Sequence, residues 1–343
     1  MIRAPLDGYP TRPRRTAIGR ERRVSVLARP PDPVQASYPW RVHVPATQLR
    51  DIRKTQPLRV LTPADWAQWT EQGYVIVRQA VAPETVAALT DGLRSFLDMR
   101  PDDPSTWTSP HTGNDRLPGH SGLVEMYNHQ AQWDVRQTPR VYEAFADIWD
   151  LDELWVTIDF ANVNPPNRGE RAFGGFVHWD VDTSTDPLPV SCQAVLSLTA
   201  GDEDIGGFQC VPEIFAEWEK WVSRQPSDRD PFTPDITGYS ITTPEVAPGD
   251  LIIFNSLLPH GVHPNVSERR VRMAQYLTMA PAWEENAELR EARVRFWRDR
   301  VPPHPPEGGV RKEESELYGS ARLTELGERL LGLREWHEGS VVG

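Results

Sequence analysis

Two histidines and an aspartate of this chain have the types and spacing of ligands to one metal ion. His178 and Asp180 are separated by one residue in FVHWDVD. On a strand, side chains at this spacing project from one face, about 6.6 Å apart. Downstream, after the apolar run 250–256, LLPHGVHPN offers His260 or His263 as a third ligand. Two imidazoles and one carboxylate on one face of an ion leave three positions open, as in non-haem Fe(II) oxygenases.

A cluster of arginines follows this histidine segment at Arg269, Arg270 and Arg272. In an iron enzyme that uses 2-oxoglutarate, the oxo-acid end of the co-substrate chelates the metal. The distant carboxylate then needs a planar, bidentate cation, which arginine supplies better than lysine. In RVRMAQYL, Arg270, Arg272 and Tyr276 share one face of the expected strand. One of the first two is therefore expected to point inward.

The elements that must position these residues are mainly β-strands. The segments with strand character are LWVTIDFANV (154–163), GGFVHWDVD (174–182), VSCQAVLSL (190–198), GGFQCVP (206–212), DLIIFNS (250–256) and RVRMAQYLTM (270–279). Turns rich in Pro, Gly and Asp separate them, with one helix-like insertion at about 213–224. This pattern predicts an antiparallel barrel or sandwich.

Helices flank the predicted strands on both sides in the sequence. Thr62 followed by Pro63 and Asp65 is typical of a helix start, and Gly73 of a helix end. A strand at 74–79 and a helix from Pro83 to about residue 99 follow. Further helical patterns lie at about 140–150, 283–299 and 321–334. The predicted fold is thus mainly β with flanking helices.

Composition and charge restrict the class of protein. The 343 residues are 38% hydrophobic with mean hydropathy −0.53, and no apolar run approaches the roughly 20 residues that span a bilayer. The N-terminus lacks a secretory core, so we expect a cytoplasmic protein without a membrane partner. Two cysteines are too few for a disulfide framework.

The net charge of −12 makes nucleic acid a poor partner. The first 60 residues nevertheless hold 13 Arg and Lys against 4 Asp and Glu, a net +9. Residues 1–58 are rich in Pro and Arg without a sustained period, so we expect an extended arm. This arm either lies on the acidic body or serves as an interaction tail.

Taken together, these features resemble the phytanoyl-CoA dioxygenase family of Fe(II)/2-oxoglutarate oxygenases over about residues 60–282. The motifs that carry the resemblance are TPADWAQWTEQGYVIVRQAVAPETV, HWDVD, the strand of Gln193 leading to GGFQCVP, PGDLIIFNSLLPHGVHPN and SERRVRMAQYLTM. The resemblance implies a double-stranded β-helix, a jelly-roll or cupin-like barrel. It also implies three regions: an arm over 1–58, the dioxygenase domain over 59–282 and a helical extension over 283–343.

The resemblance also implies which of the alternative residues are used. In the family pattern, the metal-binding histidine is followed by glycine and then by Pro-Asn, which selects His260 over His263. The family arginine precedes a small residue by two positions, which selects Arg272, ahead of Ala274. The predicted metal ligands are thus His178, Asp180 and His260.

The residues that hold the oxo-acid carboxylate are less closely matched. Many relatives place a lysine where this chain has Asn164. Asn164 could only hydrogen-bond the carboxylate, or the task falls to Asn162, Thr157 or Gln193. The family's Pro-Gly-Ser-His stretch after the glycine-rich strand is replaced here by Pro-Glu-Ile-Phe, starting at Pro212.

The activity implied is hydroxylation of an unactivated C–H bond in a small or medium organic metabolite. Fe(II) is the cofactor, 2-oxoglutarate and O2 are co-substrates, and succinate and CO2 are released. Asp180 favours a hydroxylase, because family halogenases lack this carboxylate. One alternative is a zinc or iron protein with the same triad that hydrolyses or binds a small molecule. Another is a catalytically inactive barrel that binds a partner through its basic arm.

Overall fold

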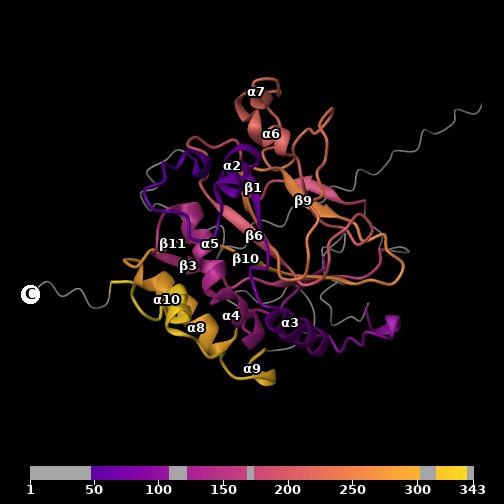
Figure 1. The fold of residues 1–343 in the computed structure, drawn as a ribbon, viewed down its shortest axis with the longest axis vertical. Coiled ribbons are helices and arrows are strands. Elements are labelled where there is room, and N and C mark those ends of the chain that lie inside the picture. The colour runs from indigo at the N-terminus through magenta and orange to yellow at the C-terminus, as the bar shows by residue number, and fades with distance from the viewer. Residues whose placement is uncertain (1–47, 108–121, 168–173, 302–313, 338–343) are drawn as a thin grey trace, which may run out of the picture.

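The computed structural model describes residues 48–107, 122–167, 174–301 and 314–337. Within them, two antiparallel sheets face each other, and helices lie mainly against the outer face of the larger sheet (Figure 1). The larger sheet has the strand order β1 (Tyr74–Val77), β8 (Leu251–Asn255), β6 (Cys192–Ser197), β10 (Arg272–Leu277), β4 (Ala161–Asn164) and β2 (Leu123–Val124). The smaller sheet has the order β5 (Phe176–His178), β9 (His260–His263) and β7 (Gly207–Cys210). A separate pair joins β11 (Met279–Pro281) to β3 (Leu154–Val156).

The strand register decides which side chains of the larger sheet face the smaller one. Residues directly opposite each other in neighbouring strands project to the same face. Arg272 lies opposite Asn164. Tyr276 lies opposite Val195, and Gln193 shares that face two residues before. This inner face is therefore polar along β10 and β4, where a site can be built.

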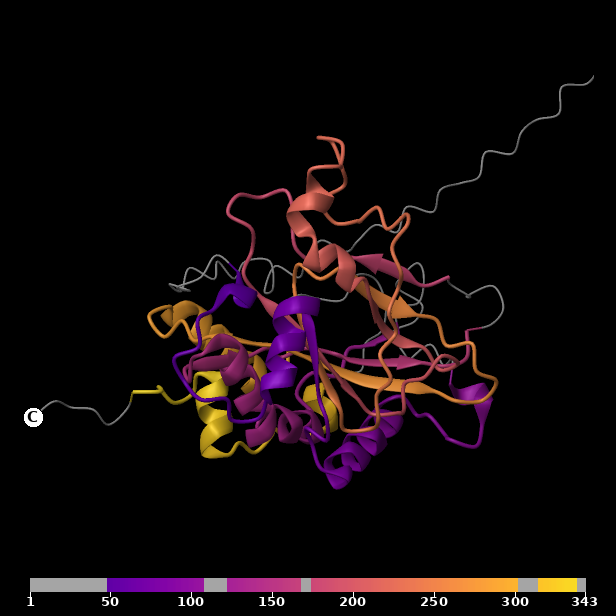
Figure 2. The same cartoon turned by 45° about the horizontal axis from the view of Figure 1, so that its top comes forward.

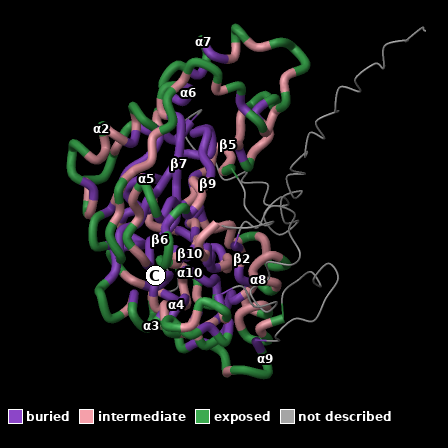
Figure 3. Tube along the Cα trace, turned by 90° about the vertical axis from the view of Figure 1, so that its right-hand side faces the viewer, coloured by how far each residue is buried: buried purple, intermediate pink, exposed green. Residues whose placement is uncertain are grey.

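The outer face of the larger sheet is apolar and forms the main core with the helices. Its buried side chains are Val75, Val77, Val163, Leu196, Leu251, Ile253, Met273 and Leu277. Strands that are apolar on one face and mixed on the other are typical of a sheet covered by helices on one side. Figure 3 shows β6, β7 and β10 in the buried centre of the molecule, whereas β5 is only partly buried.

Helices complete the described part of the fold. They are α2 (Pro63–Gln72), α3 (Pro83–Phe96), α4 (Gln130–Arg136), α5 (Pro139–Trp149), α6 (Pro212–Ala216), α7 (Trp218–Val222), α8 (Ala287–Asp299), α9 (Glu314–Leu317) and α10 (Glu325–Leu331), with short 3-10 turns at Leu49–Asp51 and Pro104–Thr106. The predicted start of α2 is confirmed, because the Thr62 hydroxyl accepts from the Asp65 N–H and the Asp65 carboxylate accepts from the Thr62 N–H. In Figure 2, α6 and α7 lie beyond the smaller sheet, away from α3. None of the helices in the described ranges has the length and apolar character needed to cross a bilayer.

The segment before α2 is held on the body. Leu49 and Ile52 are buried in the main core. Asp150, at the end of α5, forms an ion pair with Lys54 and accepts hydrogen bonds from the N–H and hydroxyl of Thr55 at 2.7 and 2.6 Å. Burial alone would raise the pKa of Asp150, but these contacts lower it to about 2. Residues 1–47, which include most of the predicted arm, lie outside the described residues.

Several expectations about the strands need correction. The mainly antiparallel fold with helices is confirmed, but the two sheets do not close into a barrel in the described part of the chain. The segments 154–163 and 270–279 each divide into two strands that belong to different sheets. Thr157 and Thr278 lie at these two breaks and hydrogen-bond each other. The two segments therefore pass from one sheet to the other side by side. Segment 174–182 is a strand only as far as His178.

Candidate active site

The smaller sheet brings two histidines side by side. His178 ends β5, His260 begins β9, and the two residues are directly paired. Their rings therefore project to the same face, with centroids 4.8 Å apart. His260 lies on a strand, and its pairing with His178 fixes its position. The pairing also explains why His260 rather than His263 meets His178: residues at odd spacing on a strand face opposite sides.

Asp180 reaches the same place from just beyond the end of β5. The intervening Trp179 is 1% exposed, and its indole N–H donates to the Leu257 carbonyl at 2.8 Å. Its own backbone N–H donates to the Phe232 carbonyl at 2.8 Å. These contacts anchor Trp179 on the side away from the histidines, so the chain turns and Asp180 points back toward them.

The three side chains form a compact set of donor atoms. Asp180 Oδ1 lies 3.0 Å from His178 Nε2, and Asp180 Oδ2 lies 3.2 Å from His260 Nε2. One ligand atom from each residue lies within 4.8 Å of the others. The side chains of His260, His178 and Asp180 are 7%, 28% and 45% exposed, so the set is closed on the His260 side and open at Asp180. A ligand can therefore approach the open side.

Protonation also favours a cation at this set. The Leu258 carbonyl accepts from His260 Nδ1 at 2.9 Å, and this contact orients the ring so that Nε2 points to Asp180. Surrounding protein desolvates the Asp180 carboxyl and would raise its pKa, but His178 and His260 hold it well below its usual range. An ionised carboxylate and two imidazole nitrogens on one side fit Fe(II), and also Zn²⁺ with an open position.

Arg272 lies on the inner face of the larger sheet, at the start of β10. It is 6% exposed, and one terminal nitrogen donates to Asn162 Oδ1 at 2.6 Å and Asn164 Oδ1 at 2.9 Å. A Cβ built on Gly207 of the smaller sheet would lie 3.0 Å from Arg272 Nε, so this glycine lets β7 approach the guanidinium. The Tyr276 hydroxyl also lies beside Arg272. Arg272 is therefore held between the two sheets.

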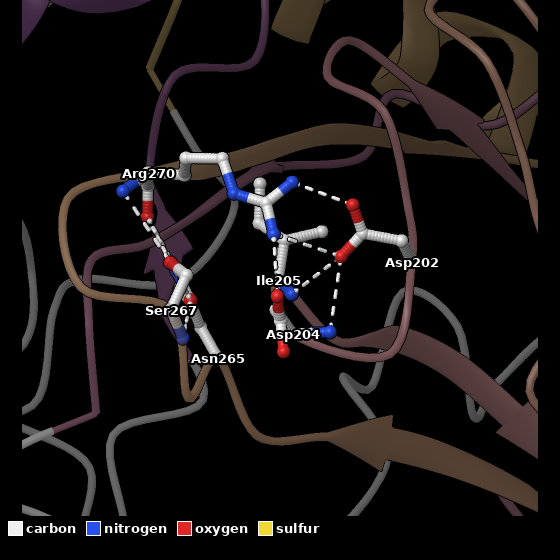
Figure 4. A network of polar contacts seen from close by, with 6 residues as sticks. All are labelled: Asp202, Asp204, Ile205, Asn265, Ser267 and Arg270. Atoms are coloured by element: carbon white, nitrogen blue, oxygen red, sulfur yellow. Dashed lines mark hydrogen bonds and ion pairs between the residues drawn. The ribbon is translucent and has the colours of Figure 1, made fainter.

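Arg270 does not share this face, contrary to the expectation from strand spacing. The strand begins only at Arg272, so alternation does not extend back to Arg270. Its guanidinium instead pairs with Asp202 at 2.5 and 3.0 Å on the surface (Figure 4). Asn265 donates to the Arg270 carbonyl at 2.7 Å and to the Asn164 carbonyl at 2.9 Å. The two Asn265 contacts are to backbone carbonyls, so they join the connection between β9 and β10 to β4 without the Arg270 side chain.

The remaining predicted residues lie in three different places. Gln193 donates from Nε2 to Asp180 Oδ2 at 2.9 Å, so it contacts a predicted metal ligand. Asn164 contacts Arg272, as described above. The Thr157 hydroxyl accepts a hydrogen bond from the Thr278 N–H at 2.9 Å, at the point where the two segments change sheets. The contact between Gln193 and Asp180 has no signal in the sequence, because it depends on how the chain turns after β5.

Comparison with known proteins matches residues 69–274 to the family model of phytanoyl-CoA dioxygenase (PhyH). The matched region covers more than half of the chain and includes every predicted metal ligand. This chain belongs to the phytanoyl-CoA dioxygenase family. Membership of the PhyH family supports the general class of oxygenases that use iron and 2-oxoglutarate.

The individual proteins that resemble this PhyH-family chain share less than 30% of their residues with it. The Ava biosynthesis cluster protein O of Aspergillus versicolor is 28% identical over 246 residues, covering 63% of this chain and 77% of that protein. The crystal structure of GIG2 from Candida albicans shares the fold, with a TM-score of 0.58 and 12% identity over 86% of this chain and 81% of that chain. EvdO2 from Micromonospora carbonacea var. aurantiaca, solved with 2-oxoglutarate, gives a TM-score of 0.46 and 16% identity over 66% of this chain and 94% of that chain.

Proposed function

We propose that this protein is an Fe(II)- and 2-oxoglutarate-dependent dioxygenase that hydroxylates a C–H bond of a small or medium organic metabolite. The observation that carries the proposal is the convergence of His178, Asp180 and His260 from separated segments, together with an arginine, Arg272, buried between the larger sheet and Gly207 of the smaller one. When bound, iron(II) would supply the oxidising power together with 2-oxoglutarate and O2, and 2-oxoglutarate would be converted to succinate and CO2. The protein itself binds and orients the substrate and co-substrates, and it excludes water from the site.

Each residue has a distinct task in this proposal. His178, Asp180 and His260 hold the metal on one side and leave its other side to the co-substrates. Arg272 binds the distant carboxylate of 2-oxoglutarate, and its guanidinium is kept in place by the Asn162 and Asn164 amide oxygens. These amides keep the charged group oriented before the co-substrate arrives.

Gln193 orients the carboxylate ligand rather than the co-substrate. Its amide N–H donates to Asp180 Oδ2, and a hydrogen bond of this kind fixes which oxygen faces the metal. The presence of Asp180 supports hydroxylation, because a carboxylate ligand occupies the position that chloride takes in family halogenases. The relative named after a biosynthesis cluster supports a substrate from secondary metabolism.

The proposal is tested with the full-length protein. Anaerobic protein loaded with Fe(II) should develop a weak visible charge-transfer band when 2-oxoglutarate is added, and succinate should form when O2 is admitted. Protein that retains zinc through purification, shows no such band and forms no succinate would instead support the hydrolase or binding alternative. Failure to bind any divalent metal would overturn the assignment of the triad.

A further inference from the structure

The C-terminal section contacts the segment that joins β2 to α4, through one buried carboxylate. Glu314 begins α9 and is 3% exposed. Its Oε1 accepts the backbone N–H of Tyr127 at 2.8 Å, that of Asn128 at 2.9 Å, and the hydroxyl of Tyr318. All three donors reach Oε1, whereas Oε2 is buried without a hydrogen-bond partner among the described residues, and burial raises the pKa of this carboxyl. The contacts at Oε1 therefore define how Glu314 is held.

A buried arginine holds the same peptide from the other side. Arg136 in α4 is 0% exposed and donates to the Tyr127 carbonyl at 2.6 Å. Its other terminal nitrogen donates to the Asp159 carbonyl at 2.8 Å. Burial lowers the pKa of Arg136 to about 10, opposed by Asp159 and Glu314, so it remains charged at neutral pH. Tyr127 is thus fixed at both its N–H and its carbonyl.

These contacts lead within a few residues to the proposed 2-oxoglutarate pocket. Asp159 and Phe160 directly precede β4, and the Phe160 carbonyl accepts the Tyr276 N–H at 3.1 Å. The Tyr127 and Phe160 rings pack with centroids 5.5 Å apart. Two residues further on, Asn162 accepts from Arg272. A displacement of Tyr127 would therefore be transmitted to the strand that orients the guanidinium.

We propose that Glu314 is a positioning residue for the 2-oxoglutarate pocket. By holding Tyr127 and Asn128 against Arg136, it keeps β2 and β4 in the register that places Asn162 next to Arg272. The inference rests on the proposed function for the identity of the ligand. Glu314 lies outside the region matched by the family model, so this contact belongs to the C-terminal section of this chain.

The test compares Glu314→Ala and Glu314→Gln in the full-length protein. Because Glu314 Oε1 accepts both backbone N–H groups, its removal predicts that exchange of the Tyr127 and Asn128 amides accelerates by roughly tenfold in E314A. E314Q keeps an oxygen acceptor, so its exchange should lie between E314A and wild type. The dissociation constant for 2-oxoglutarate, read from the charge-transfer band, should rise in the same order while Fe(II) affinity stays unchanged.

Glu335→Gln is the matched control, because Glu335 lies in the same section but pairs with Arg290 on the surface. It should leave both readouts at wild-type values. Wild-type exchange in E314A, or faster exchange with unchanged 2-oxoglutarate affinity, overturns the positioning role. If E314A does not fold, E314Q decides by the same readouts. A wild-type protein that binds no 2-oxoglutarate overturns the proposed function, whereas the exchange rates separately decide whether Glu314 holds Tyr127.

Discussion

Replacing Arg272 with alanine tests the binding pocket most directly. The side chain is 6% exposed, so the carboxylate that it binds would be largely removed from water. Truncating one partner of such a buried, hydrogen-bonded charge pair costs about 2–5 kcal/mol. At about 1.4 kcal/mol for each factor of ten, this corresponds to 2-oxoglutarate binding that is about 30-fold to several thousand-fold weaker.

The same substitution should also destabilise the protein by a separate route. Asn162 and Asn164 are 0% and 5% exposed, and each would lose the hydrogen bond from Arg272. A hydrogen bond to a charged group contributes about 1.5–3 kcal/mol to stability. Arg272→Lys keeps the charge but not the planar fork, so its 2-oxoglutarate affinity should fall between those of wild type and R272A.

Anaerobic titration of the Fe(II)-loaded protein with 2-oxoglutarate measures the affinity, and thermal unfolding measures the stability. Arg270→Ala is the matched control. Arg270 lies two residues away, but its guanidinium is 43% exposed and pairs with Asp202 on the surface. R270A should therefore bind 2-oxoglutarate like the wild type. Wild-type affinity in R272A, or an equal loss in R270A, would refute the role of Arg272.

Three further predictions concern the second histidine ligand, the Gln193 contact with Asp180, and the Asp150 contacts before α2. His260→Ala should abolish stoichiometric Fe(II) binding, measured as metal content after dialysis, whereas His263→Ala should retain it because His263 faces the other side of β9. Gln193→Ala should weaken Fe(II) binding by about 10- to 100-fold by releasing Asp180, and a metal competition titration giving wild-type affinity would contradict this. The pKa of Asp150 is lowered to about 2, so its stabilising contribution is present above the ordinary carboxyl pKa of about 4 and is lost as the pH falls toward 2. Asp150→Asn should reduce this acid dependence in unfolding experiments, and an unchanged pH profile would exclude the carboxylate as its source.

Local patterns in the sequence identified the chemistry of this protein. The spacing of two residues between His178 and Asp180 correctly predicted that their side chains meet, although β5 ends at His178 and Asp180 returns through the turn at Trp179. The capping residues of α2 are equally local, since Thr62 and Asp65 satisfy each other. The arginine in a strand after the second histidine also follows from sequence order.

The tertiary structure decided which alternatives are used. Strand spacing could not separate Arg270 from Arg272, because β10 begins only at Arg272 and the Arg270 side chain instead pairs with Asp202, 68 residues earlier in the sequence. The positions where strands change sheets are likewise set by pairing between distant segments. For this reason the sequence predicted a barrel, whereas the described strands form two facing sheets.

The contacts of Gln193 with Asp180 and of Glu314 with the Tyr127 backbone have no local signature either. When the partner of a side chain is a backbone N–H, or a carboxylate that only folding brings near, the contact leaves no recognisable motif in the sequence. The sequence by itself therefore determined the reactive groups and the family. Only the packing of distant segments decided how those groups are held, because their partners come together only when the sheets form.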